Sequence, residues 1–288
     1  AGWSYLYSAV FKRPEKSLED FYINRFGKKL YSMFFESYTE KLWGVHPSKI
    51  SPEWGAQRVK GLSLAKALLT FCGLSGRQRE TSLIEEFSYP KRGPGQFWET
   101  MADAVKKMGG EVRCNARVVR LEAMESGGWS VVLEGGETIM ADAVFSSMPI
   151  SDLIAAIPGV PEPVREVAAA LPYRDFMTVG LLVDRLAITN HTKLKTVNEI
   201  VPDTWIYVQD RRVKLGRIQI FNNWSPYMVD DITKHVWIGL EYFCTEGDGL
   251  WGMSDSEFVT MAASELRDMG VLGSDVPILD SVRIRVKK

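Results

Sequence analysis

The sequence predicts an α+β protein built on an antiparallel sheet. Four stretches in its second half have strand character, and no helical pattern separates them. They lie at residues 177–184, 204–209, 217–222 and 236–244. Consecutive strands without helices between them favour antiparallel pairing. The first third of the chain has helical periodicity instead, so we expect a helical cap that lies over a ligand.

The expected cap is divided by glycines. Ser17 and Asp20 form something close to a capping box, which begins a helix. Gly27 interrupts that helix, and a second one runs from Leu30 and ends at Gly44. Beyond it we expect a turn at 47–52 and helices at 53–58 and 62–74.

The middle of the chain mixes helix and strand. A loop at 89–95 precedes a helix at 97–108, which Gly109 and Gly110 end. The strands expected next are 111–115, 117–121, a hairpin of 129–133 and 137–140, and a buried strand at 143–147. The later elements are a helix at 161–171, a helix at 258–269 opened by a capping box at Ser254–Glu257, and a final strand at 278–286.

Composition excludes several classes of protein. Hydrophobic residues make up 45% of the chain and charged residues 25%, which are ordinary values for a globular protein. A formal net charge of -1 at pH 7 lacks the basic excess of a nucleic-acid-binding protein. The longest apolar stretch, residues 62–74, is too short to span a bilayer. We therefore expect a soluble protein with no transmembrane segment and no nucleic-acid partner.

Cysteine and histidine usage argues against a disulfide framework and a metal site. Cys72, Cys114 and Cys244 are widely spaced and form no C-x-x-C motif, so we expect a reducing, cytoplasmic location. The start of the chain has no signal-peptide pattern. The histidines stand alone without ligand spacing, and there is no P-loop or nucleophile elbow. We therefore expect no metal.

The stretch Phe34–Gly44 concentrates groups that suit a binding wall. Phenylalanines, a tyrosine and a tryptophan lie there beside Lys41. Each polar tip needs a partner when it is buried, so a wall for a flat or ring-shaped ligand carrying negative charge is one interpretation. The other is an amphipathic helix whose rings belong to the core and whose charges face water. The residue types alone leave both open.

The same stretch carries a resemblance to known flavoproteins. Residues 38–44, Tyr-Thr-Glu-Lys-Leu-Trp-Gly, resemble the YT-x-K-x-W segment of UDP-galactopyranose mutases. Four further segments resemble FAD-dependent oxidoreductases of the amine oxidase and protoporphyrinogen oxidase superfamily, and they occur in the family's order. They are residues 50–58, 89–95, 141–149 and 240–243.

The resemblance implies a division into three parts. Residues 1–88 would be the helical cap of a substrate domain, 89–150 a partial FAD-binding-domain segment, and 151–288 the antiparallel-sheet substrate domain. Family members hold FAD with a G-x-G-x-x-G turn, whereas here Gly93-Pro94-Gly95 is followed by Trp98 in place of a third glycine. We therefore expect a fragment that lacks the N-terminal glycine motif and the C-terminal FAD segment. FAD would bind weakly to this chain, or not at all.

The resemblance also implies substrate-binding residues. Tyr38 and Trp43 would line the substrate pocket, and Lys41 of the same motif would also bind substrate. Arg58 would approach substrate charge; the alternative for Arg58 is a surface arginine. The mutase motif has glutamine where this chain has Leu42, and the spacing from Trp43 to Arg58 is one residue longer than expected. Both departures argue against a nucleotide sugar, and the apolar Leu42 fits a more hydrophobic substrate, such as a carotenoid precursor or a porphyrinogen.

Cofactor-binding residues follow from the same comparison. The glycines of the 91–95 loop lack a Cβ and could let the backbone approach a flavin ring; the alternative is a loop that caps the following helix. Strand and loop residues further on would contact the cofactor, or would be buried strand residues. The expected cofactor-binding set is Arg92, Gly93, Gly95, Val118, Val119, Ser147 and Pro149. No catalytic acid or base is identified, and Glu241, Tyr242 and Trp224 are weak candidates.

Three functions agree with these observations. The first is the substrate-binding portion of an amine oxidase-like enzyme, in which a hydride moves from a C–N or C–C site to flavin N5. The second is a mutase-like flavoprotein acting on a nucleotide sugar without net redox change. The third is a catalytically silent binding domain. A small-molecule substrate is expected in each case, and a homodimer is one quaternary state to test.

Overall fold

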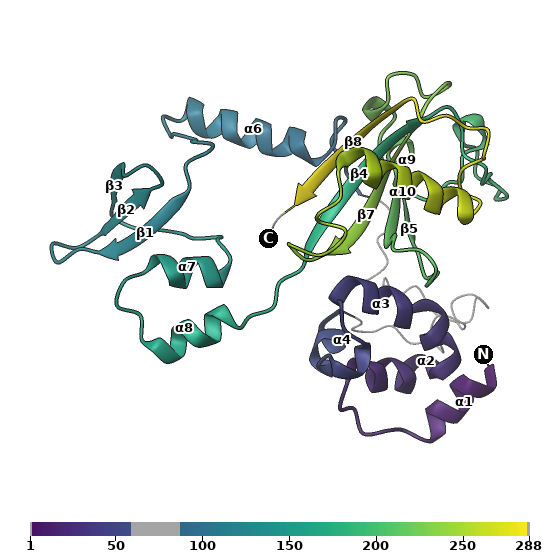
Figure 1. Cartoon of the computed structure of the whole chain (residues 1–288), viewed down its shortest axis with the longest axis horizontal. Coiled ribbons are helices and arrows are strands. Elements are labelled where there is room, and N and C mark those ends of the chain that lie inside the picture. The colour runs from purple at the N-terminus through teal and green to yellow at the C-terminus, as the bar shows by residue number, and fades with distance from the viewer. Residues whose placement is uncertain (1, 59–86, 287–288) are drawn as a thin grey trace. The chain divides into compact units, whose positions relative to one another are not determined.

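The computed structural model describes residues 2–58 and 87–286, and it has the predicted mixed α+β architecture. The described residues form two compact units (Figure 1). Unit 1 draws on Ala1–Gln96 and Arg174–Lys287, and unit 2 is Phe97–Tyr173. The boundaries expected at 88/89 and 150/151 divide the chain by function and not by compactness, and they stay a prediction.

Unit 1 is organised by a five-stranded sheet in which every described pairing is antiparallel. The strand order is β5-β6-β7-β4-β8. The strands are β4 (Asp175–Val183), β5 (Trp205–Tyr207), β6 (Arg217–Ile220), β7 (Val236–Cys244) and β8 (Asp280–Val286). β4 and β7 pair along their full length, from Asp175 opposite Cys244 to Val183 opposite Val236. The prediction of an antiparallel sheet is confirmed.

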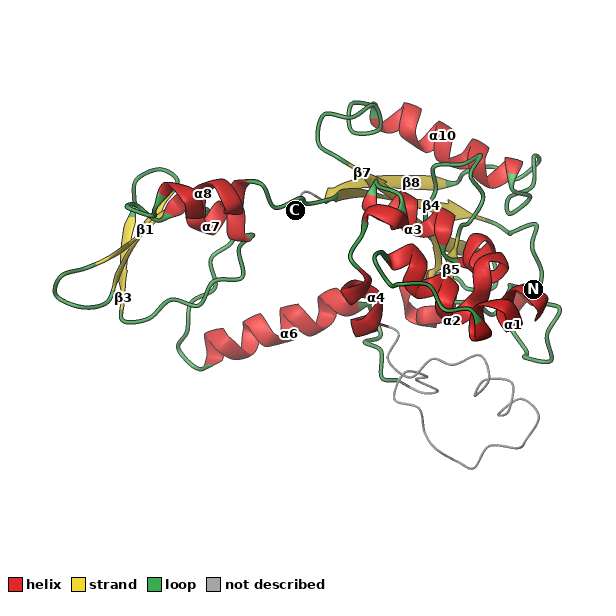
Figure 2. Ribbon diagram, turned by 90° about the horizontal axis from the view of Figure 1, so that it is seen from below, coloured by secondary structure: helices red, strands yellow, loops and turns green. Residues whose placement is uncertain are grey.

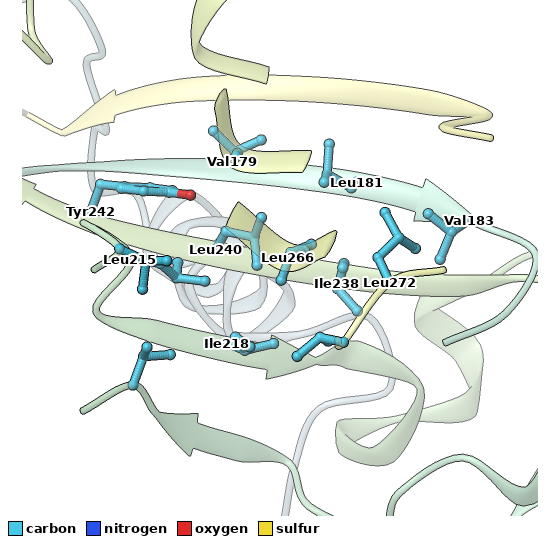
Figure 3. Close-up of a cluster of buried hydrophobic side chains, with 14 of the residues drawn as sticks. Val179, Leu181, Val183, Leu215, Ile218, Ile238, Leu240, Tyr242, Leu266 and Leu272 are labelled. Atoms are coloured by element: carbon cyan, nitrogen blue, oxygen red, sulfur yellow. The ribbon is translucent and has the colours of Figure 1, made fainter. Parts of the chain in front are cut away.

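One face of this sheet carries the main hydrophobic core. Side chains alternate between the two faces of a strand, and the core-facing residues of β4 and β7 pack against α10 (Asp255–Asp268). Figure 2 shows α10 along one face of the sheet, and Figure 3 shows side chains of this core. Ser254 and Glu257 form the predicted capping box at the start of α10. Fully buried members of the core are Val179, Leu181, Ile238, Leu240, Phe258 and Leu266.

The opposite face of the sheet is aromatic and polar. Trp205 is opposite Gln219, and Tyr207 is opposite Arg217, which in turn is opposite Glu241. Residues that pair across antiparallel strands share a face. These five side chains therefore lie on the side away from the core of α10, and that side carries the candidate site.

The helical part of unit 1 has its own small core around Leu18, Phe21 and Tyr31. Gly27 divides α2 (Leu18–Phe34), with φ 78° and ψ 153°. A Cβ there would lie 2.7 Å from the Ser4 carbonyl carbon, so glycine is required by space as well as by conformation. The other elements here are α1 (Gly2–Val10), α3 (Glu36–Trp43), η1 (Pro47–Lys49) and α4 (Pro52–Arg58).

A glycine ends α3 as predicted. Gly44 takes a left-handed conformation at the end of α3, and its N–H donates to the Glu40 carbonyl. The sequence did not predict α1, and the helix expected at 62–74 lies outside the described residues. Short elements complete unit 1: η2 (Val197–Glu199), α9 (Phe221–Trp224) and η3 (Pro226–Met228).

Unit 2 contains a three-stranded antiparallel sheet in the order β1-β2-β3. Its elements are β1 (Val118–Ala123), β2 (Trp129–Leu133), β3 (Thr138–Ala141), α7 (Ile150–Ala156) and α8 (Glu162–Ala169). α6 (Pro94–Lys107) leads into it. The helix starts at Pro94, earlier than predicted, because proline suits the first turn. The predicted hairpin is confirmed.

Two predicted strands are wrong. Residues 111–115 and 143–147 are irregular in the structure. A strand is stabilised by hydrogen bonds to a neighbour, and neither segment pairs with any strand in the described part of the chain. Their apolar and β-branched residues therefore misled the prediction. Among the described residues, no helix is long and apolar enough to cross a membrane.

The core of unit 1 gives a direct stability prediction. Leu240 on β7 is completely buried, so Leu240→Ala removes packed methyl groups and should lower the free energy of unfolding by about 2–5 kcal/mol. Leu194→Ala is the matched control: Leu194 is 66% exposed, and such surface changes stay within about 0.5 kcal/mol. Urea unfolding measures both. Equal effects would contradict the core described here.

Candidate functional site

A pocket of about 780 Å³ lies in unit 1 where α2 and α3 meet β5 and the residues next to it. Its described lining is mostly aromatic and apolar. The lining residues are Tyr22, Met33, Phe34, Phe35, Tyr38, Thr39, Leu42, Trp54, Asp203, Trp205, Ile206, Tyr207 and Gln209. Such a volume and lining are typical of a small-molecule site.

Aromatic rings on the two walls of the pocket contact each other. Tyr38 of α3 meets Tyr207 of β5 edge to face, with 4.6 Å between ring centroids. Tyr207 is in turn nearly parallel to Trp205, at 6.2 Å. Edge-to-face and offset ring pairs are favourable arrangements. These contacts hold the Tyr38 phenol at the wall of the pocket. Trp205 is 37% exposed and could stack on a ligand.

A buried ion pair lies behind these rings. Arg217 pairs with Glu241, whose side chain is 6% exposed, and Gln219 donates to the same carboxylate at 2.6 Å. The Arg217 guanidinium also lies over Trp205, 4.7 Å from the ring centroid, in cation–π contact. The face of the sheet next to the pocket is therefore fixed by one charged group that contacts both Trp205 and Glu241.

This environment keeps the Tyr38 phenol protonated. Burial raises the pKa of Tyr38 to about 12, and the nearby Arg217 guanidinium opposes part of that rise. The phenol is therefore neutral at physiological pH. It can donate or accept a hydrogen bond at the pocket, but it cannot act there as a phenolate.

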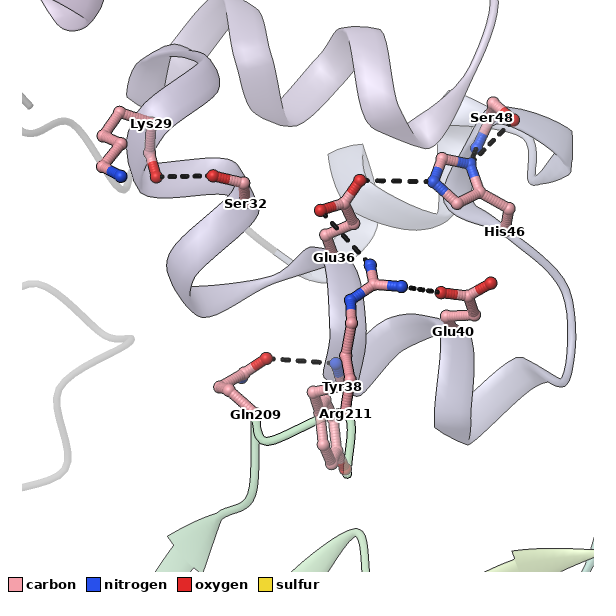
Figure 4. Close-up of polar contacts among 9 residues, drawn as sticks. All are labelled: Lys29, Ser32, Glu36, Tyr38, Glu40, His46, Ser48, Gln209 and Arg211. Carbon is pink, nitrogen blue, oxygen red and sulfur yellow. Dashed lines mark hydrogen bonds and ion pairs between the residues drawn. The ribbon is translucent and has the colours of Figure 1, made fainter. Parts of the chain in front are cut away.

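The β5–β6 loop, residues 208–216, holds α3 in place. The Tyr38 N–H donates to Gln209 Oε1 at 3.0 Å, and Gln209 Nε2 donates to the Phe34 carbonyl at 2.7 Å. Arg211 pairs with Glu36 at 3.3 Å and with Glu40 at 3.1 Å, and Figure 4 shows these contacts. The loop thus contacts both ends of the short break between α2 and α3.

Lys41 has a different environment from the one its motif implied. Its ammonium donates to three carbonyl groups of the β5–β6 loop: Val208 at 3.2 Å, Asp210 at 2.7 Å and Leu215 at 2.9 Å. Burial lowers the pKa of Lys41, while Glu265 and Asp210 oppose that shift. An ammonium has three N–H donors, and all three are used within the protein. A contact between Lys41 and substrate stays an untested prediction.

The other two expected substrate residues lie in or near α3 and α4. Trp43 packs edge to face on Trp54, which lines the pocket, with 5.5 Å between centroids. The Trp43 indole Nε1 is buried and has no hydrogen-bond partner among the residues that the structure describes. Arg58 is the last residue of α4, and its side chain lies outside what the structure describes. Tyr38 is thus the expected residue that lines the pocket directly.

Of the expected cofactor residues, Arg92 and Gly93 lie on a loop of unit 1, and Gly95 lies in the first turn of α6. Ser225 Oγ donates to the Lys91 carbonyl at 2.6 Å, which holds this loop against η3. Gly93 has φ 84°, and a Cβ there would lie 3.3 Å from Met228 Cε. At Gly95 a Cβ would meet nothing within 4 Å. The Arg92 side chain is exposed.

The remaining expected cofactor residues lie in unit 2. Val118 and Val119 belong to β1, and Val119 is 42% exposed. Ser147 and Pro149 lie on the irregular segment before α7. Gly95 leaves space for a ring to approach the backbone, and the exposed Arg92 can pair with a phosphate group. The chemistry of these residues therefore fits a flavin cofactor. Their role in binding it stays a prediction.

Sequence reasoning missed most of the pocket wall opposite α3. Asp203, Trp205, Tyr207 and Gln209 lie more than 150 residues from Tyr38 in the chain. A signal was present: two rings two residues apart share a face of a strand. Of the weak catalytic candidates, Glu241 is in the buried ion pair, Tyr242 is in the α10 core, and the Trp224 indole donates to the Thr204 carbonyl at 3.0 Å.

No metal centre is evident in the part of the chain that the structure describes. Within those ranges, no group of three or more His, Cys, Asp or Glu side chains could hold a metal ion. Cys114 and Cys244 are free thiols. The cytoplasmic location and the homodimer remain predictions.

The chain is thus an α+β protein with an antiparallel sheet and an aromatic pocket on the polar face of that sheet. The chain belongs to the family of flavin-containing amine oxidoreductases, whose sequence profile matches residues 9–283. This confirms the expected resemblance to flavin-dependent oxidoreductases.

Solved structures agree on the fold. A reduced UDP-galactopyranose mutase matches with a TM-score of 0.75 and 16% identity, covering 99% of this chain and 58% of its own. A putative protoporphyrinogen oxidase from Exiguobacterium sp. 255-15 matches with a TM-score of 0.65 and 15% identity, covering 98% and 58%. An oxidoreductase from Methanosarcina mazei matches with a TM-score of 0.62 and 12% identity, covering 96% and 58%. The chain thus spans 58% of the length of these structures.

The buried ion pair gives a prediction for the site. Arg217→Met leaves the Glu241 carboxylate buried without its cation, so the free energy of unfolding should fall by about 3–5 kcal/mol. The double variant Arg217→Met/Glu241→Gln should recover most of that loss, because no buried charge remains. Both are measured by urea unfolding.

Arg185→Met is the control for this experiment. Arg185 is 57% exposed and pairs with Asp184 and Asp275, and an exposed ion pair contributes at most about 1 kcal/mol. If Arg217→Met costs no more than Arg185→Met, the Arg217–Glu241 pair does not organise this face of the sheet.

Proposed function

We propose that this chain is the substrate-binding part of an FAD-dependent oxidoreductase, and that the aromatic pocket holds the reacting part of an apolar or aromatic amine. The observation that carries the proposal is the lining of the pocket. Rings from α3 and β5 form its walls. Asp203 is the ionisable carboxylate among its described lining residues, and no described residue forms an ion pair with it.

The charge of the pocket favours an amine over a nucleotide sugar. A cationic amine would be attracted by the Asp203 carboxylate and by the faces of Trp205 and Tyr207. A substrate with a diphosphate would need cations, and the described lining residues include neither lysine nor arginine. Arg217 is close by, but its charge is already paired with Glu241.

The residues of this chain would bind and orient the substrate. Trp205 and Tyr207 would stack on its flat part, and Leu42 would exclude water from the pocket. The neutral Tyr38 phenol would offer one directional hydrogen bond. When bound, FAD would supply the redox chemistry by accepting a hydride at N5. Arg92, Gly93 and Gly95 of unit 1, and Val118, Val119, Ser147 and Pro149 of unit 2, are the residues that we assign to holding it.

A mutase-like activity is the second candidate. The observation that favours it is the placement of the YT-x-K-x-W segment, because Tyr38 and Thr39 of that segment line the pocket. Leu42 also lines the pocket, where the motif has glutamine, so a polar group for a sugar nucleotide is missing. This difference supports the oxidoreductase. A catalytically silent binding domain is the third candidate.

A visible absorption spectrum of the native flavoprotein that contains this chain separates the three functions. We expect flavin bands that bleach, without oxygen, when an aromatic or apolar amine is added, because the amine transfers a hydride. UDP-galactose should leave the bands unchanged and should not be turned over after reduction with dithionite.

The outcomes of this experiment are distinct. Turnover of UDP-galactose after dithionite treatment, with no bleaching by any amine, would contradict the proposal and support the mutase. A protein without flavin bands would contradict both enzymatic functions and support a binding domain.

A further inference from the structure

Lys41 lies on the face of α3 that meets the sheet. Residues three and four apart share a helix face, so Lys41 lies beside Tyr38 on this face, and Tyr38 lines the pocket. The Lys41 ammonium does not end in the pocket. It ends on three carbonyl groups that span the β5–β6 loop from Val208 to Leu215. The Lys41 ammonium therefore connects α3, which forms one wall of the pocket, to the β5–β6 loop, which follows the strand that forms the opposite wall.

Gln209 joins the same two parts through the helix ends. The N–H groups of the first helical turn and the carbonyl groups of the last turn have no partner within a helix. Tyr38 N–H belongs to the first turn of α3, and the Phe34 carbonyl belongs to the end of α2. The Gln209 carboxamide accepts from the first and donates to the second. One side chain therefore fixes the angle between α2 and α3.

The loop alternates between two kinds of contact. The carbonyl groups of Val208 and Asp210 bind Lys41, whereas the side chains of Gln209 and Arg211 bind the helices. Arg211 is 58% exposed, and exposed ion pairs contribute little. Lys41 and Gln209 are therefore the stronger contacts.

The far side of the loop is anchored to the core. Glu265 of α10 is buried and accepts from the N–H groups of Lys214 at 2.7 Å and Leu215 at 3.0 Å. The carbonyl group of the same Leu215 binds Lys41. The loop is thus fixed to α10 on one side and to α3 on the other. Displacement of α3 must break one of these connections.

We propose that Lys41 is a positioning residue that sets the width of the aromatic pocket, with Gln209 as its partner. By holding α3 on the β5–β6 loop, the two residues keep Tyr38 against Tyr207 and the wall of α3 at a fixed distance from β5. Lys41 then acts on substrate affinity through the pocket and not by contact with the substrate. The effect on substrate affinity rests on the proposed function, whereas the role of Lys41 and Gln209 in holding α3 does not.

The test uses Lys41→Met and Gln209→Leu in the native flavoprotein that contains this chain. Hydrogen exchange measured by mass spectrometry should accelerate at least about tenfold, which corresponds to 1.4 kcal/mol, in peptides covering 36–43 and 208–215. With an amine that bleaches the flavin, KM should rise about tenfold while kcat stays within about threefold, because uniform binding is lost. Lys41→Arg keeps donors for the carbonyl groups and should restore part of both effects.

Lys214→Met is the matched control. Lys214 lies on the same loop, its side chain is exposed, and its contact with Glu265 is through the backbone N–H. Exchange and KM should both stay unchanged. If Lys41→Met does not fold, Gln209→Leu alone decides, because Gln209 is only half-buried.

Two results would overturn the proposal. A rise in KM without faster exchange in Lys41→Met, which Gln209→Leu does not reproduce, would mean that Lys41 contacts the substrate directly. Unchanged exchange in all variants would mean that these contacts do not hold α3. If no amine reduces the flavin, the proposed function fails, but the exchange measurement still decides the structural part.

Discussion

The contact of the Lys41 ammonium with three carbonyl groups is the constraint on which the site depends. A desolvated cation needs its donors satisfied, and here they are satisfied by the backbone of Val208, Asp210 and Leu215. Those carbonyl groups would otherwise lack these partners in a half-buried place, and an unsatisfied buried polar group costs about 1–3 kcal/mol. The Lys41 ammonium and the three carbonyl groups therefore satisfy each other's hydrogen-bonding groups. These hydrogen bonds connect residues that are 167 to 174 positions apart in the chain.

The two faces of the sheet differ in their chemistry. The face toward α10 is apolar and contains the main core. The other face carries a buried charge pair, Arg217 and Glu241, under a row of rings. A buried pair adds little stability over apolar residues, but loss of one partner is costly. Such a pair is best understood as fixing Trp205, on which Arg217 lies. The family to which the chain belongs is flavin-containing.

Local signals in the sequence predicted the local structure well. The capping box at Ser254, the break at Gly27 and the left-handed end at Gly44 each depend on a few neighbouring residues, and each is present. The strands expected at 111–115 and 143–147 failed because a strand also needs a neighbour. Only part of the pocket lining could be predicted. Tyr38 was found through a motif, whereas Trp205 and Gln209 reach the same pocket through tertiary packing that no local pattern encodes. Lys41 was noticed for its charge, but its three partners are backbone groups, which leave no trace in a sequence.

The central claim is that the rings of the pocket bind substrate, and Trp205→Ala tests it most directly. Trp205 lines the pocket and is 37% exposed, so its removal should leave fold and flavin content intact. In the native flavoprotein we predict that the dissociation constant of an amine that reduces the flavin rises about tenfold, from a loss of 1.4 kcal/mol. Trp3→Ala, which changes an indole that is 86% exposed on α1, should have no effect. An unchanged dissociation constant in Trp205→Ala, or loss of flavin together with affinity, would contradict the account.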